Sequence, residues 1–148
     1  VVLGSGEAAY ESFFSELAAR NPGAVGVKIA FVPSLARKIY AGADMFLMPS
    51  QSEPCGLAQM IALRYGTIPI VRETGGLRDS IHDAGDKNGN GFTFKSYNAH
   101  DMLDAVVRAR AYYDDKMKWG RLVNTALKQD FSWTKSAKDY IALYNDIH

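Results

Sequence analysis

The stretch Met45-Phe46-Leu47-Met48-Pro49-Ser50-Gln51-Ser52-Glu53-Pro54-Cys55-Gly56-Leu57 decides the fold. Residues 45–48 are apolar without alternation, which predicts a strand covered on both faces. Residues 50–54 interrupt regular structure, and apolar residues recur at helical spacing from Gly56 onward. In an open α/β sheet, ligands bind where strands end, and a helix that begins there points backbone N–H groups at an anion. We therefore expect Glu53 at the mouth of a site, with a solvated loop carboxylate as the alternative.

A second stretch repeats this pattern. Residues 67–71 predict another short strand, which runs into Arg72-Glu73-Thr74-Gly75-Gly76-Leu77. Turns that follow successive parallel strands lie side by side at one edge of a sheet. Glycines in such a turn let a phosphate approach the backbone closely, although a Gly-Gly pair alone is more often simple turn chemistry.

The two stretches together resemble the C-terminal half of bacterial glycogen synthases and plant starch synthases. The residues that carry the resemblance are Ser50, Glu53–Leu57, Arg64–Thr67, Pro69, Val71, Arg72 and Thr74–Leu77. The similarity continues through residues 39–44, 130–133 and 140–144, so it covers nearly the whole chain. Two long motifs in the right order are far more specific than one short pattern.

The alternation of strands and helices favours an α/β fold with a parallel sheet. The resemblance makes residues 1–148 one Rossmann-like, doubly wound domain, the nucleotide-sugar half of a two-domain GT-B glycosyltransferase. It assigns residues 1–3, 27–31, 45–48, 68–71 and 92–94 to the second to sixth strands, so the central first strand is missing. We expect this slot to be filled, because unpaired buried backbone groups are costly. Three possibilities are open: residues 1–3 pair directly with residues 45–48, a segment from another chain inserts as a strand, or the chain is only part of a longer ordered molecule.

The resemblance implies a retaining glucosyltransferase that moves glucose from ADP-glucose to an α-1,4-glucan, with the N-terminal domain as a necessary partner. Glu53 is then the catalytic residue, which binds sugar hydroxyls. The implied substrate-binding residues are Phe31, Cys55, Gly56, Leu57, Thr74, Gly75 and Gly76. By the resemblance, backbone N–H groups of residues 55–57 would contact the sugar and the distal phosphate, and residues 74–76 would shape the neighbouring wall. Phe31 would stack on the adenine, with a core aromatic as the alternative.

The chain also departs from the pattern. Ile61 stands where many related transferases have a second Glu, and Ala58 stands where the synthases often have Thr. The Lys-x-Gly-Gly-Leu loop and the basic residues that grip the diphosphate lie outside the chain, so we expect the isolated chain to catalyse nothing. Arg72 is either a substitute for those cations or a surface charge at the end of a strand.

Composition and smaller motifs argue against several functions: binding to nucleic acid, to an anionic membrane and to a dinucleotide. A net charge of +1 gives no electrostatic case for nucleic acid or an anionic membrane. The single cysteine, Cys55, cannot form an internal disulfide, which suits the reducing cytoplasm of a bacterium. A plastid is the expected location if the chain is from a plant. Residues 4–9 mimic a dinucleotide-binding turn, but the next strand ends without the required acidic residue. We expect no cofactor and no metal.

A non-catalytic nucleotide-binding or structural module is the alternative function. The choice of ADP- or UDP-glucose, the acceptor length and the oligomeric state stay open.

Helix signals punctuate the rest of the chain. Ser34, Asn98 and Ser132 are expected to cap helices, since short polar side chains accept from free N–H groups at a helix start. The aromatic residues of the C-terminal helices, such as Trp133 and Tyr140, are expected to pack in the core.

Overall fold

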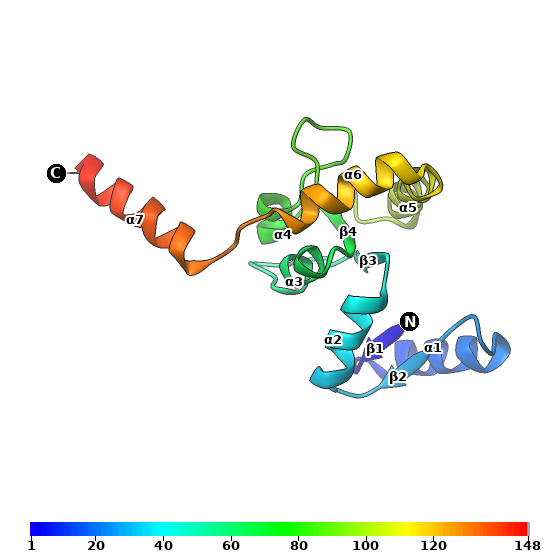
Figure 1. The fold of residues 1–148 in the computed structure, drawn as a ribbon. Helices are drawn as coiled ribbons and strands as arrows, with labels where there is room; N and C mark the ends of the chain where they lie inside the picture. The colour runs from blue at the N-terminus through cyan, green and yellow to red at the C-terminus, as the bar shows by residue number, and fades with distance from the viewer. Residues whose placement is uncertain (148) are drawn as a thin grey trace. The chain divides into compact units, whose positions relative to one another are not determined.

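The computed structural model describes residues 1–147, and the chain divides into two compact units (Figure 1). The first unit is Val1–Gly42 and the second begins at Ala43. Every strand pair in both units is parallel, as expected for an α/β fold.

The first unit alternates two strands and two helices: β1 (Val2–Gly4), α1 (Ala8–Arg20), β2 (Val27–Ile29) and α2 (Pro33–Gly42). Leu3 of β1 lies opposite Lys28 of β2. Strand β2 ends two residues earlier than predicted, before Phe31. Helix α2 begins at Pro33, so the prediction that Ser34 is its cap is wrong. Proline suits the first helical position because its missing N–H would have no partner there.

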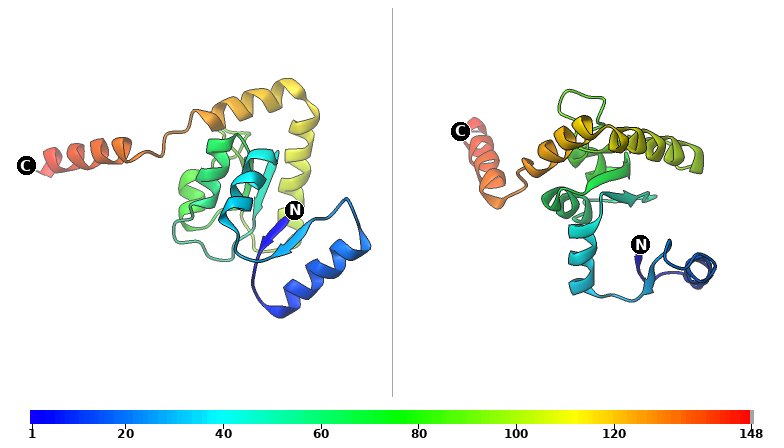
Figure 2. Two further views of the ribbon diagram at one scale, coloured as in Figure 1. Left: turned by 60° about the horizontal axis from the view of Figure 1, so that its bottom comes forward. Right: turned by 45° about the vertical axis from the view of Figure 1, so that its right-hand side comes forward.

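The second unit carries a three-stranded sheet in the order β3-β4-β5. Its elements are β3 (Met45–Met48), α3 (Ala58–Tyr65), β4 (Ile68–Arg72), α4 (Gly75–Ser80), β5 (Phe92–Phe94), α5 (Ala99–Asp114), α6 (Lys116–Leu127) and α7 (Trp133–Ile147). Strands β3, β4 and β5 lie side by side, and α5 and α6 meet at a sharp corner (Figure 2).

The core of the second unit forms around the central strand β4. Residues 68–71 are buried, and Leu63, Leu77 and Phe92 close over them. Strand β3 occupies an edge of this sheet, and Leu47 is 43% exposed. The prediction that residues 45–48 are covered on both faces is therefore wrong within the described chain.

Two of the three predicted caps are confirmed. The side chain of Asn98 accepts from the Asp101 N–H at 2.9 Å, and the Ser132 hydroxyl accepts from the Lys135 N–H at 3.4 Å. The packing predicted for the aromatics of α7 is wrong within residues 1–147, since Trp133 is 88% and Tyr140 is 60% exposed. An amphipathic pattern identifies an apolar face but not what covers it.

Strand pairing tests the expectation of a missing central strand. The neighbours expected within each unit are confirmed, β1 with β2 and β3 with β4 with β5. Residues 1–3 and residues 45–48 belong to different units. Direct pairing between them, strand addition by another chain and a longer molecule therefore all stay predictions.

Candidate functional site

Two turns meet at the carboxyl ends of β3 and β4, as the sequence predicts. The first is the loop of residues 49–57, which we call the Glu53 loop, and the second is the turn of residues 73–76, which we call the Gly-Gly turn. Met48 and Val71 are register partners at the ends of their strands. The Gly76 N–H donates to the Glu53 carbonyl oxygen at 3.1 Å. The backbone of one turn thus holds the backbone of the other.

The two glycines are needed for this close approach. A Cβ on Gly75 would overlap the Glu53 carbonyl, and one on Gly76 would overlap the Cys55 carbonyl. Gly75 also has a φ of 45°, which disfavours other residues. The expected roles of the two glycines were phosphate approach or simple turn chemistry, and in the structure the close approach of the neighbouring loop already requires them.

Arg72 fixes the first part of the Glu53 loop. Its Nη1 donates to the Gln51 carbonyl at 2.7 Å and contacts the Ser50 carbonyl at 3.4 Å. Its guanidinium lies over the Tyr97 ring, 5.6 Å from the ring centroid. Arg72 is therefore not the free surface charge that was one of its two expected roles. Sequence reasoning missed its part in ordering this loop.

Gln59 fixes the second part of the loop from inside the protein. Its side chain is fully buried at the start of α3, and Nε2 lies 3.2 Å from the Cys55 carbonyl and 3.0 Å from the Gly56 carbonyl. The same nitrogen lies 3.1 Å from the Ser80 hydroxyl. That hydroxyl donates to the Gly76 carbonyl at 2.6 Å. Sequence reasoning missed this bridge, although a glutamine within an apolar helical face was a visible signal.

These contacts determine which way the loop N–H groups point. A trans peptide places its C=O and N–H on opposite sides. The Cys55 and Gly56 carbonyls face Gln59, so the Gly56 and Leu57 N–H groups point the other way. Neither N–H donates to a protein acceptor within the described residues. Two adjacent free donors at the start of a helix are a suitable environment for an anion.

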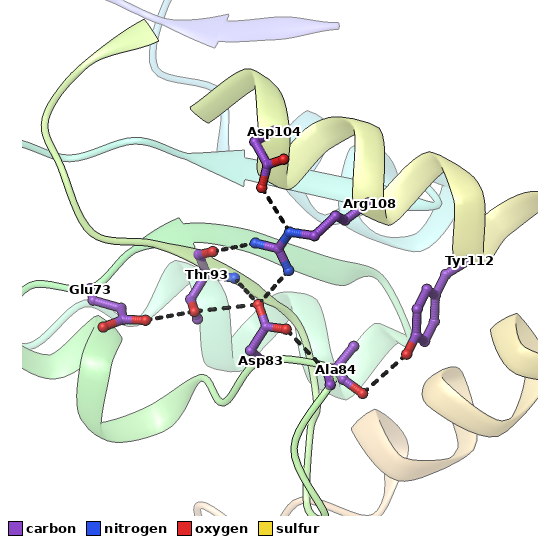
Figure 3. A network of polar contacts seen from close by, with 8 residues as sticks. Glu73, Asp83, Ala84, Thr93, Asp104, Arg108 and Tyr112 are labelled. Carbon is purple, nitrogen blue, oxygen red and sulfur yellow. Dashed lines mark hydrogen bonds and ion pairs between the residues drawn. The ribbon is translucent and has the colours of Figure 1, made fainter. Parts of the chain in front are cut away.

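A polar network anchors the base of the Gly-Gly turn (Figure 3). The Thr93 hydroxyl of β5 donates to Glu73 at 2.7 Å, and the Thr93 N–H donates to Asp83 at 2.9 Å. Arg108 of α5 pairs with Asp83 at 2.7 Å and donates to the Thr93 carbonyl at 2.6 Å. The Glu73 N–H also donates to the Phe94 carbonyl. The residue just before Thr74 is therefore tied to β5 by both its backbone and its side chain.

Opposing effects set the pKa of Asp83. Burial alone would raise it, but hydrogen bonds from Arg108 and from the Thr93 and Gly85 N–H groups outweigh burial, so the pKa lies below its usual value. The pKa of Arg108 is raised, because its contacts with Asp83 and Asp104 outweigh the opposite effect of burial. Both groups stay charged at neutral pH, and the network stays intact.

The predicted site residues fall into two groups. Glu53, Cys55, Gly56 and Leu57 lie together against the Gly-Gly turn, with Glu53 half-buried and Leu57 66% exposed. Phe31 belongs to the first unit and is 88% exposed, so it is not the core aromatic that was the alternative.

Two properties of residues 1–147 bear on metal binding and membrane insertion. No group of three or more His, Cys, Asp or Glu side chains is placed to hold a metal there. None of the helices described is both long and apolar enough to cross a membrane.

Comparison with known proteins identifies the family. Residues 1–121 match the family described as "Glycosyl transferases group 1". The chain belongs to this family. As a group 1 glycosyl transferase, it is 54% identical over 99% of its length to the "Glycogen synthase" of Geobacillus thermodenitrificans (strain NG80-2). It is 53% identical to that of Bacillus anthracis over the same share.

A solved structure shares the fold of this group 1 glycosyl transferase. The catalytic domain of Starch Synthase IV from Arabidopsis thaliana, bound to ADP and acarbose, matches 98% of the chain with a TM-score of 0.83 and 39% identity. The family resemblance and the fold class predicted from sequence are confirmed. The chain spans 31% of the length of these curated relatives and of that solved chain.

Proposed function

We propose that the protein carrying this chain is a retaining glucosyltransferase that moves glucose from ADP-glucose to the non-reducing end of an α-1,4-glucan. One observation carries the proposal: the backbone hydrogen bond from the Gly76 N–H to the Glu53 carbonyl, 3.1 Å long, joins the two turns at the carboxyl ends of parallel strands. The relatives named glycogen synthase, and a related synthase with ADP and acarbose bound, support this choice of donor and acceptor. The missing N-terminal part would supply the rest of the cleft.

The chemistry follows from where charge develops. Breaking the glycosidic bond leaves negative charge on the diphosphate and positive charge on the sugar. The Gly56 and Leu57 N–H groups are free to donate to the distal phosphate. The Glu53 carboxylate would bind the sugar hydroxyls and stabilise the positive charge. No protein nucleophile is needed, because these two groups act on opposite charges of one transition state.

The remaining predicted residues also have proposed roles. Thr74, Gly75 and Gly76 would form the wall beside the sugar, and the Cys55 N–H would add a further donor. Phe31, being exposed, is available to stack on the adenine. A cytoplasmic location is part of the proposal and rests on the bacterial relatives.

Glucosyl transfer by the full-length protein is the direct test. The protein is incubated with labelled ADP-glucose and glycogen, and incorporation is compared with a UDP-glucose reaction. We expect transfer from ADP-glucose, and we expect Glu53→Gln to lower turnover by about 100-fold while ADP affinity, measured by calorimetry, stays near normal. Glu16→Gln is the matched control, since Glu16 is an exposed helix carboxylate paired with Arg20.

The outcomes separate the two functions. Incorporation no higher than without protein, together with normal ADP binding, would replace the enzyme by the non-catalytic binding module. An effect of Glu53→Gln confined to ADP binding would move Glu53 away from the sugar.

A further inference from the structure

We propose that Gln59 and Ser80 are positioning residues, which orient the phosphate-binding N–H groups of the Glu53 loop and lock that loop to α4. This role rests on the proposed function for its ligand, but its geometry is independent of it. Gln59 holds two loop carbonyls, and Ser80 joins Gln59 to the Gly76 carbonyl. Neither residue touches the substrate in this account.

The chemistry of the contacts fixes the orientation of the Gln59 amide. Two of its partners are backbone carbonyls, which can only accept, so the amide nitrogen must face them. The Ser80 hydroxyl gives its proton to the Gly76 carbonyl and therefore accepts from one of the two Gln59 N–H groups, so the other N–H is shared between the Cys55 and Gly56 carbonyls. The chain of contacts runs in one direction, from Gln59 through Ser80 to Gly76.

The other half of the Gln59 amide argues against a purely stabilising role. Its Oε1 is buried and has no hydrogen-bond partner among the described residues. An unpaired buried acceptor is costly, and an apolar side chain of the same size would avoid that cost. The amide is therefore better explained by the two carbonyls that it orients than by stability.

Gly56 shows how closely the loop fits around this side chain. It has a φ of 72°, and a Cβ on it would lie 2.6 Å from Gln59 Oε1. The left-handed conformation of Gly56 turns its carbonyl toward Gln59, so that the Leu57 N–H faces outward. Loss of the Gln59 donors would free both peptide planes to rotate.

Two variants test this in the full-length protein: Gln59→Met, which keeps the volume but has no donor, and Ser80→Ala. ADP binding is measured by calorimetry, which separates the fraction of competent protein from the affinity of that fraction. We expect the Kd for ADP to rise by about tenfold in Gln59→Met, the scale of one or two hydrogen bonds to a charged ligand. We expect a smaller rise in Ser80→Ala and recovery in Ser80→Thr, which restores the hydroxyl.

Thr67→Val is the matched control. The Thr67 hydroxyl is buried and donates to the Ala43 carbonyl at 2.9 Å, before the amino end of β4 and away from both turns. Its loss removes the same kind of hydrogen bond as Ser80→Ala. We expect lower thermal stability in both variants but an unchanged Kd for ADP in Thr67→Val. Positioning is overturned if Thr67→Val reproduces the rise, or if Gln59→Met binds ADP within twofold of wild type.

A second readout does not depend on ADP binding. The Gly76 amide donates to the Glu53 carbonyl, so its hydrogen exchange reports whether the two turns stay joined. We expect about tenfold faster exchange of this amide in Gln59→Met and Ser80→Ala, and no change in Thr67→Val. If the wild type fails to bind ADP, the proposed function is wrong. Hydrogen exchange of the Gly76 amide then tests the bridge through Gln59 and Ser80 by itself. Unaltered exchange in Gln59→Met and Ser80→Ala would overturn that bridge.

Discussion

Gly76→Ala is the sharpest perturbation of the candidate site, because it adds one carbon at the contact between the two turns. The new Cβ would overlap the Cys55 carbonyl oxygen and lie 2.6 Å from its carbonyl carbon. Ordinary contact begins near 3.4 Å, so the Glu53 loop must move by about 1 Å. The atoms in the way are backbone, which cannot turn aside like a flexible side chain.

The expected loss follows from this displacement. Overpacking of a well-packed contact costs roughly 1–3 kcal/mol, and the Gly76–Glu53 hydrogen bond contributes about 1 kcal/mol. A misplacement of about 1 Å in catalytic groups can lower turnover 100-fold. We therefore expect glucosyl transfer by the full-length protein to fall by about two orders of magnitude, and ADP binding to weaken at least tenfold.

Gly120→Ala is the control for this experiment. Gly120 lies within α6, and a Cβ there would meet no atom within 4 Å. We expect normal transfer and a stability gain of up to about 1 kcal/mol, because alanine favours helix. Transfer by Gly76→Ala within threefold of wild type would refute the reasoning, since the two turns could then separate without effect on the site.

Three further predictions concern Phe31, Arg72 and Asp83. Phe31→Ala should weaken ADP binding by roughly 1–3 kcal/mol, the range for base–aromatic stacking, and unchanged affinity in a calorimetric titration would remove Phe31 from the site. Arg72→Lys should raise the KM for ADP-glucose several-fold, because an ammonium is a poor substitute for a guanidinium that both bonds the loop carbonyls and stacks on a ring. An unaltered KM would contradict this. Asp83→Asn should lower the melting temperature at neutral pH, and this deficit should shrink as the pH falls below about 4. The reason is that the ionised Asp83 carboxylate stabilises the fold above its unfolded pKa near 4, and this stabilisation is lost as the pH falls through the lower folded pKa. Scanning calorimetry across the acidic range checks this, and a deficit that stays constant until the protein unfolds in acid would be contrary to it.

The sequence predicted the parts of the fold that local pattern controls. Residues 45–48 formed the expected strand, and the apolar run at 68–71 became the buried central strand β4. Asn98 capped its helix because capping depends on residues only a few positions apart. The contact between the two turns was also predictable from the sequence, because the carboxyl ends of parallel strands lie at the same edge of a sheet.

Features that depend on distant contacts were not predictable in this way. Strand β3 lies at an edge, and the aromatic face of α7 is exposed, although both have the pattern of covered elements. Ser80 is 21 residues from Gln59, and no local pattern pairs them. The glycines of the Gly-Gly turn marked a close approach of the backbone, but the sequence did not show that the Glu53 loop is one of the neighbours, because a close approach looks the same in sequence whether the partner is a phosphate or a loop.

A crystal structure of the full-length protein with ADP would show whether the Gly56 and Leu57 N–H groups bind the distal phosphate, through the distances from their two nitrogens to that phosphate. The two N–H groups point away from the carbonyls that Gln59 holds, so we predict a phosphate oxygen at about 2.7–3.2 Å from each nitrogen. Bound ADP whose distal phosphate lies beyond about 5 Å from both nitrogens, or on the Gln59 side of the loop, would contradict the account.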